Sequence, residues 1–346
     1  MPWLLALFSS LFGAQAQTFT ELGQVMGPDV GISFASLSVG GPSITWDSIH
    51  NQLIMVFEAR TPTTASDCNK GVWALGMATS TDGTNWNIES TSVVMPTPST
   101  GNGYACVAAH PSAVFTNTGS NGRVQVYWKA ESNTDCSGSF CEYTGIGRAR
   151  IDLDASGGLG SVTIQAGTVI AFPSGRYGGY PRIVRVGSTF HMAVQLYPNV
   201  HTFTSNNPTT FTAGVLAFDP TNSDFSSSSW VYDEFMSPAM ICGDDSTFEY
   251  AMWLGSKDTD FGVTQQGGIG KSISTDFSTW FTNSTASITW AGDNNYRHFD
   301  AIKLDTDEYL LYYSVKDSGG DSTVHLAATD AAFDLSTDTP IGKVCP

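Results

Sequence analysis

Basic residues are scarce in this sequence of 346 residues. Fifteen Lys and Arg stand against 32 Asp and Glu, which gives a formal net charge of −17. A surface this acidic repels nucleic acids and anionic membranes, so we expect neither as a partner. The acidity by itself says nothing about catalysis.

Long apolar runs are also missing, since no stretch after the first residues approaches the roughly 20 apolar residues of a membrane span. The short apolar run at residues 4–8 and the sequence Ala14-Gln15-Ala16 are typical of a secretory signal peptide, although no basic residue precedes the run. A buried N-terminal helix is the alternative. We expect residues 1–16 to be a signal peptide and residues 17–346 to form one domain of a soluble, monomeric, secreted protein, extracellular or periplasmic.

Cysteine pairs with the spacing of metal ligands are absent, because no Cys-x-x-Cys sequence or matching His pair occurs. An even number of cysteines in an exported chain predicts disulfides, and six allow 15 alternative pairings. Cys136 and Cys141 are close enough to staple one loop, and Cys345 is placed to pin the end of the chain. The six are Cys68, Cys106, Cys136, Cys141, Cys242 and Cys345.

Helical periodicity is almost absent as well, and short apolar strands alternate with turn residues, which is typical of an all-β chain. One motif, a residue followed by Pro and then by apolar residues, recurs at intervals of roughly 60 to 70 residues. In the last copy Phe299 takes the place of Pro. The five copies are Gly41-Pro42, His110-Pro111, Tyr180-Pro181, Ser237-Pro238 and His298-Phe299.

Each copy is followed by a second apolar strand and by a third strand, which has a small residue at an equivalent position in every copy. Two copies continue into an aspartate turn and a tryptophan, at Asp82 and Trp86 and again at Asp276 and Trp280. These repeats predict a five-bladed β-propeller with about four antiparallel strands per blade, whose blades start near residues 41, 110, 180, 237 and 298. Residues 19–26 would supply the outer strand of the last blade and close the ring. A β-sandwich with coincidental spacing is the alternative.

The repeat resembles the five-bladed propellers of glycoside hydrolases, the broad group that holds arabinofuranosidases, xylosidases, fructosidases and mannoside phosphorylases. The resemblance covers nearly all of the mature chain and rests on the blade-opening motif and on residues 57–86, 268–280 and 309–314. It implies a secreted enzyme that acts on a poly- or oligosaccharide in the central pocket by carboxylate acid and base catalysis.

Three positions depart from the resemblance. The arabinofuranosidase-like group commonly has Asp before the opening Pro of blade one, where Gly41 stands here. It usually has a second Asp at the position of Tyr180 and a Glu at the position of Ser237. The carboxylates therefore come from elsewhere, or the protein does not hydrolyse glycosides.

The innermost strand of each blade lines the channel, and the residues before and after the opening Pro are expected to share its channel face. That face would carry a polar ring, in which Asp300 is the only carboxylate. Asp300 would be a catalytic base or an anchor for a sugar hydroxyl; a pairing with Arg297 or His298 is the alternative. The ring consists of Ser43, His110, Ser112, Tyr180, Arg182, His298 and Asp300.

Glu58 ends the second strand of blade one, at the position that Lys129 and Gln195 occupy in the next two blades. Apolar surroundings that raise its pKa would make it a general acid; an ion pair with Arg60 or Lys129 is the alternative. Blades five and one are neighbours, so we predict Asp300 and Glu58 as the catalytic pair. Glu131 and Asp258 are weaker candidates.

Five residues are expected to contact the substrate: His110, Tyr180, Arg182, Arg297 and His298. Arginines hold carboxylates and sulfates well, so an anionic sugar is one option, and structural salt bridges are the alternative. No metal ligand and no cofactor is predicted, with a structural Ca²⁺ left open.

Two other functions remain open at this point. A non-catalytic, lectin-like propeller would bind sugar in a pocket of His, Tyr and Arg without a facing carboxylate pair. A metal-dependent phosphohydrolase propeller would need a cluster of channel acids, which the sequence does not contain.

Overall fold

In the computed structural model, most of the described residues lie in strands of seven to ten residues. The structure describes residues 19–29, 31–61, 72–96, 107–131, 143–172, 178–221, 234–242, 250–257, 268–277, 279–282, 288–289, 296–316 and 321–345. The expected signal peptide lies outside these residues, as do Cys68, Cys106, Cys136, Cys141 and Asp258. Within the described ranges, no helix is long and apolar enough to cross a membrane.

The predicted all-β class is confirmed, since one 3₁₀ turn, η1 (Ser33–Ala35), is the only helical element among the described residues. Consecutive antiparallel strands form units that follow the sequence repeat. The first unit holds β2 (Ser38–Asp47), β3 (Gln52–Thr61), β4 (Val72–Ser80) and β5 (Asn87–Ile88). The second holds β6 (Val107–Thr116), β7 (Arg123–Glu131), β8 (Tyr143–Asp152), β9 (Ser161–Ile164) and β10 (Ile170–Ala171).

The remaining units have the same plan. The third holds β11 (Gly178–Val186), β12 (Thr189–Leu196), β13 (Asn199–Ser205) and β14 (Val215–Phe218). The fourth holds β15 (Glu234–Cys242), β16 (Tyr250–Lys257), β17 (Gly268–Ser274), β18 (Phe281–Thr282) and β19 (Ile288–Thr289). The fifth holds β20 (Tyr296–Leu304), β21 (Tyr309–Lys316), β22 (Ser322–Ala328) and, from the other end of the chain, β1 (Thr20–Met26).

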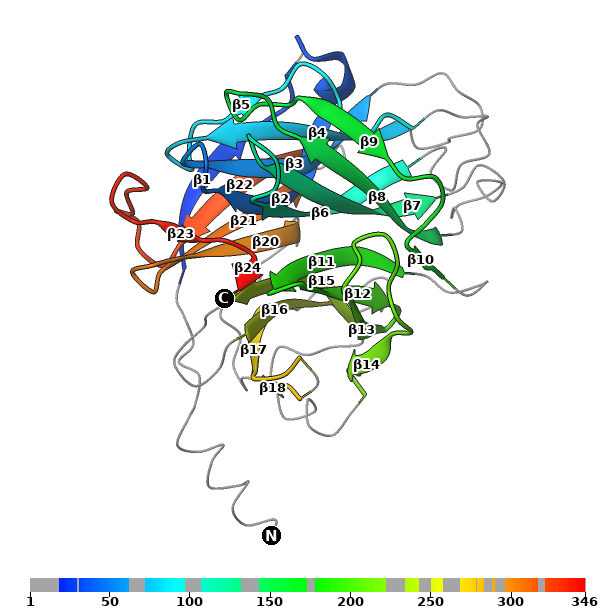
Figure 1. Ribbon diagram of the computed structural model, residues 1–346. Helices are drawn as coiled ribbons and strands as arrows, with labels where there is room; N and C mark the ends of the chain where they lie inside the picture. Colours follow the sequence, from blue (N-terminus) through cyan, green and yellow to red (C-terminus); the bar gives the residue numbers. More distant parts are fainter. Residues whose placement is uncertain are drawn as a thin grey trace.

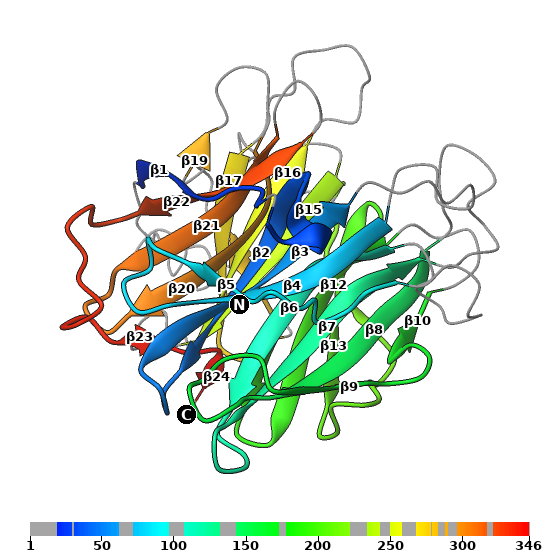
Figure 2. The same ribbon diagram turned by 90° about the horizontal axis from the view of Figure 1, so that it is seen from above.

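The first strands of the units pack against one another. β6 contacts β2 and β11, β15 contacts β11 and β20, and β20 contacts β2. The N-terminal strand β1 pairs antiparallel with β22, and the two lie side by side in Figures 1 and 2. This arrangement is a β-propeller-like fold, in which the opening strands surround a common centre.

Apolar side chains fill the spaces between units because most strands are buried on both faces. In β3, the run Leu53, Met55 and Phe57 packs toward the fifth unit, and the alternate residues Ile54 and Val56 pack toward the second. Each hydrophobic cluster of the described core combines two neighbouring units, and one joins the last unit to the first.

The repeated aspartate turns bring their tryptophans between units, as predicted. The Asp82 carboxylate accepts hydrogen bonds from the backbone N–H groups of Thr84 (2.8 Å) and Asn85 (2.7 Å). Trp86 then packs edge-on against Tyr312 of the fifth unit, with ring centroids 5.6 Å apart. The equivalent Trp280 packs on Phe218 of the third unit at 5.5 Å.

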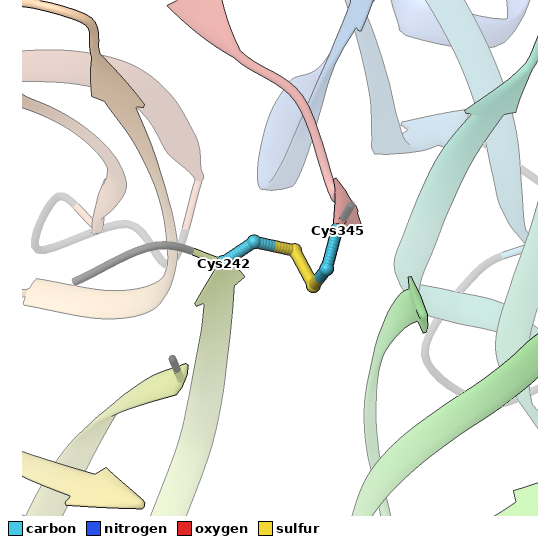
Figure 3. The surroundings of a disulfide bond; sticks show 2 residues. All are labelled: Cys242 and Cys345. Atoms are coloured by element: carbon cyan, nitrogen blue, oxygen red, sulfur yellow. A yellow bond between two sulfur atoms is a disulfide. The ribbon is translucent and has the colours of Figure 1, made fainter. Parts of the chain in front are cut away.

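The C-terminal segment, residues 340–345, runs across the opening strands, and we call it the C-terminal strap. Its strand β23 (Pro340–Ile341) pairs with β20, and β24 (Val344–Cys345) pairs in parallel with β11. A disulfide joins Cys345 to Cys242 at the end of β15 (Figure 3). The prediction that Cys345 pins the chain end is confirmed, and the strap ties the third, fourth and fifth units together.

The partly buried His191 on β12 is expected to make the stability of the fold depend on pH. Its ring stacks on Phe277, with centroids 4.0 Å apart, and burial lowers the pKa of His191 below the ordinary value of 6.5. Between the two pKa values the unfolded chain therefore binds more protons than the folded chain. We expect the free energy of unfolding to fall as the pH drops through 6.5 and to level off below the folded-state pKa.

Urea unfolding of the wild type and of His191→Gln over this pH range tests the expectation. Above pH 6.5 the difference between the two proteins should be constant, because the imidazole is neutral in both states. Below it, the wild type should lose stability faster than the variant. Parallel curves through the whole range would show that His191 makes no contribution.

Candidate functional site

Each opening strand contains a β-bulge at its recurring motif. Gly40 pairs with Glu58 and Ser43 with Val56, so Gly41 and Pro42 together oppose one residue of β3. Register shifts occur at the same place in the other units. Proline suits a bulge because it has no N–H to lose from the ladder.

In four of the five bulges, the residue before the proline slot adopts a left-handed conformation. The φ angles are 51° at Gly41, 50° at His110, 50° at Tyr180 and 47° at His298. Such angles are unusual for residues other than glycine and concentrate at functional sites. Because the four bulges share one conformation, the side chain at this position points in an equivalent direction in each unit.

Three of these residues bring their rings together. The ring centroid of His110 lies 4.2 Å from that of Tyr180 and 4.1 Å from that of His298, and the rings of Tyr180 and His298 are 5.1 Å apart. His110 is buried, and the other two are partly buried. The prediction that these three residues share one face is therefore supported by their contacts.

Glu58 completes this group by filling the space at Gly41. A Cβ atom at Gly41 would lie 2.7 Å from the carboxyl carbon of Glu58 and 2.8 Å from its Oε2. The same Oε2 accepts a hydrogen bond from the backbone N–H of His110 at 2.9 Å and lies 3.1 Å from His110 Nδ1. A carboxylate from the adjacent strand thus occupies the space where a side chain of residue 41 would lie. We call Glu58, His110, Tyr180 and His298 the bulge cluster.

The equivalence of Glu58, Lys129 and Gln195 is confirmed by their register. Their pairing partners are the small residues Gly40, Ala109 and Gly179 of the opening strands. All three side chains are buried. The stem of Lys129 occupies the space beside Gly179, where a Cβ would come within 2.9 Å of its Cδ.

Arg182 lies two residues after the bulge residue Tyr180 and is fully buried. Its guanidinium donates hydrogen bonds to the carbonyl oxygens of Pro111 (2.7 Å), Pro181 (2.8 Å) and Phe299 (2.8 Å), and at 3.5 Å to that of Pro42. These are the residues in the proline slot of four units. Burial lowers the pKa of Arg182, an effect that the charge of Asp300 opposes.

Asp300 is the centre of a second buried group. Its Oδ2 accepts hydrogen bonds from Ser43 Oγ (2.8 Å) and Ile44 N–H (2.9 Å), and it forms an ion pair with Lys343 of the C-terminal strap. Arg182 Nε lies 3.8 Å from the other oxygen. Burial lowers the pKa of Lys343, and the Asp300 carboxylate counteracts that shift.

This second group, which we call the channel core, argues against two roles predicted from the sequence. Asp300 and Arg182 have no exposed surface, and protein groups bind their polar atoms. Neither is placed to act as a catalytic base or to contact a substrate. Lys343 was not predicted at all, because it stands outside the repeat and no motif surrounds it.

Only some of the remaining candidate residues have side chains that the structure describes. Arg60 pairs with Asp321 rather than with Glu58. The backbone of Arg297 pairs with Ser314 on β21, but its side chain, like that of Glu131, is outside the described atoms. Asp258 also lies outside the described residues.

Comparison with known proteins places the fold. No family model matches the chain, and no curated protein matches its sequence. A glycosyl hydrolase from Bacteroides ovatus has a similar structure, with a TM-score of 0.55 and 14% identity over 93% of this chain and 92% of that one. Sucrose-6-phosphate hydrolase from Lactobacillus gasseri has a TM-score of 0.59 at 8% identity, over 94% of this chain and 63% of the other.

A third structure comes from work on the GH130 family of mannoside phosphorylases, which contains glycoside hydrolases that target β-1,2 mannosidic linkages in Candida mannan. It has a TM-score of 0.61 and 14% identity, over 91% of this chain and 94% of that one. At these identities the likeness concerns the fold. The chain therefore shares its β-propeller-like architecture with these three solved structures.

Proposed function

We propose that the five units are the blades of a closed propeller and that the protein acts on a poly- or oligosaccharide at the bulge cluster. Closure is supported by the contact of β20 with β2, by the pairing of β1 with β22 and by the apolar cluster between the fifth and first units. The sequence of residues 1–16, which is typical of a secretory signal peptide, supports an extracellular site of action.

The observation that carries the proposal is the Glu58 carboxylate in the place of a side chain at position 41. Glycoside hydrolysis adds water across a C–O bond, so the leaving oxygen gains a proton and the attacking water loses one. A buried carboxylate beside an imidazole can exchange such protons. The rings of Tyr180 and His298 would contact the sugar next to Glu58, because they are only partly buried.

One observation favours the alternative of a lectin-like protein. Glycosidases with two carboxylates place them on opposite sides of the scissile bond. Among the described side chains of the bulge cluster Glu58 is the sole carboxylate, and Asp300 is enclosed in the channel core. A sugar-binding propeller needs no second acid.

Hydrolysis of a panel of neutral and anionic polysaccharides and aryl glycosides by the wild type tests the proposal. We expect reducing ends to appear with at least one class of substrate. Saturable binding of a sugar without cleavage, measured by calorimetry on the same panel, would support the lectin-like alternative. The absence of both cleavage and binding would contradict both functions.

Tyr180→Ala then locates the site. We expect the variant to weaken binding of the active sugar by up to about 10-fold, taking the contribution of an aromatic contact, about 0.5–1.5 kcal/mol, as the guide. Tyr197→Ala, which removes an exposed ring at the end of β12 and outside the cluster, is the control. An unchanged affinity in Tyr180→Ala would place the sugar elsewhere.

A further inference from the structure

Three members of the bulge cluster have side chains of the kinds that bind metal ions. One donor atom each from Glu58, His110 and His298 lies within 4.8 Å of the other two. Two imidazoles and one carboxylate are typical of catalytic zinc sites and of other first-row transition metals, and not of Mg²⁺ or Ca²⁺, which prefer oxygen. We propose that these residues bind one divalent transition metal ion, with Zn²⁺ as the reference.

The backbone holds the three ligands in place before any ion arrives. His110 and His298 stand at bulges with φ angles of 50° and 47°, and their ring centroids are 4.1 Å apart. Glu58 reaches the site because Gly41 leaves room for its carboxyl group. The N–H of His110 then orients Oε2 from 2.9 Å. Groups that orient a ligand in this way strengthen metal binding.

Charge also suits a cation at this place. Two neutral imidazoles and one carboxylate carry a net negative charge, which a divalent ion reverses. Of the two fully buried cations of the channel core, Lys343 pairs with Asp300, while Arg182 is influenced by the charges of both Asp300 and Glu58.

A metal at this position would change the role of Glu58 from proton carrier to ligand. Three protein ligands leave coordination positions for water or for a sugar oxygen, as in catalytic zinc sites. The ion would act as a Lewis acid in a site that has no second carboxylate. The proposal concerns binding and does not require that the protein cleaves glycosides. It replaces the prediction from the sequence that no metal is bound.

Calorimetry with Zn²⁺ on untagged, chelator-treated full-length protein tests the proposal, together with the visible absorption of the Co²⁺ form. We expect one ion per chain, and ligand-field bands of Co²⁺ bound by nitrogen and oxygen. Each of Glu58→Gln, His110→Gln and His298→Gln should weaken Zn²⁺ binding by at least about 100-fold, since even the loss of an orienting group costs 10- to 100-fold. His191→Gln, which changes a histidine outside the cluster, should bind like the wild type.

Thermal unfolding with and without Zn²⁺ keeps the test independent of how well each variant folds. Zn²⁺ should raise the Tm of the wild type and of His191→Gln, and leave that of the three ligand variants unchanged. Less than one bound ion in the wild type, or equal affinity in the ligand variants, would overturn the proposal.

The substrate panel in the presence of a chelator separates this proposal from the proposed function. Cleavage that the chelator abolishes and Zn²⁺ restores would support both proposals. Cleavage that a chelator leaves unchanged would show a glycosidase that does not use the metal. Stoichiometric Zn²⁺ binding without cleavage would support the metal site alone.

Discussion

Replacing Asp300 by alanine is expected to lower the free energy of unfolding by about 3–5 kcal/mol, because it leaves two buried cations without their counter-charge. Lys343 and Arg182 are at most 1% exposed, and both are paired with Asp300. The same substitution also removes the acceptor for Ser43 Oγ and for the N–H of Ile44. Urea unfolding of the wild type and the variant at pH 7 measures the loss.

An ion pair of the same unit whose carboxylate is exposed provides the control. Asp307 pairs with Lys303 at 2.7 Å, and the side chain of Asp307 is 85% exposed whereas that of Lys303 is 4% exposed. Asp307→Asn should therefore change the free energy of unfolding by less than about 1 kcal/mol. If Asp300→Ala also lowered the free energy of unfolding by less than about 1 kcal/mol, the channel core would not stabilise the fold.

A double-mutant cycle tests whether Asp300 acts through the strap. Lys343→Met removes the cation that the strap delivers to Asp300. Combined with Asp300→Ala, it should destabilise the protein less than the sum of the two single changes, by about 1–3 kcal/mol. Additive effects would mean that Asp300 stabilises the fold through Arg182 and backbone groups alone.

The repeat could be predicted from the sequence because each copy encodes its own local structure. A proline marks the bulge, an apolar strand such as residues 53–57 follows, and an aspartate turn places a tryptophan against the preceding unit. The pairing of β1 with β22 followed from the missing outer strand of the last unit. These signals lie within single units, so they need no knowledge of distant contacts.

The two levels of the channel were not predictable from strand alternation. Residues before and after the opening proline were expected to share one face, because side chains alternate along a regular strand. The bulge breaks that regularity. His110, Tyr180 and His298 therefore meet in the bulge cluster, while Arg182 and Asp300 point into the enclosed channel core. Gly41 was read as the loss of an acid, although its missing side chain is what admits Glu58.

Glu58→Gln and Gly41→Ala are both expected to reduce kcat/KM on the active substrate by at least about 100-fold, the usual contribution of a positioned acid or base. Glutamine keeps the shape of Glu58 but cannot carry its proton or its full charge. Alanine at position 41 keeps Glu58 but places a methyl group 2.7 Å from its carboxyl carbon. A glutamate side chain can rotate away from such a contact, so the protein should fold with the carboxylate displaced from His110.

Gly187→Ala separates this displacement from backbone strain. Gly187 has a φ angle of 56°, close to the 51° of Gly41, and a Cβ there would meet nothing within 4 Å. Both alanine variants should lose about 1–2 kcal/mol of stability from the left-handed backbone, and only Gly41→Ala should lose activity. His110 carries a full side chain at φ 50°, which shows that this backbone accepts one. Full activity in Gly41→Ala, with loss in Glu58→Gln, would show that the carboxylate works from another position.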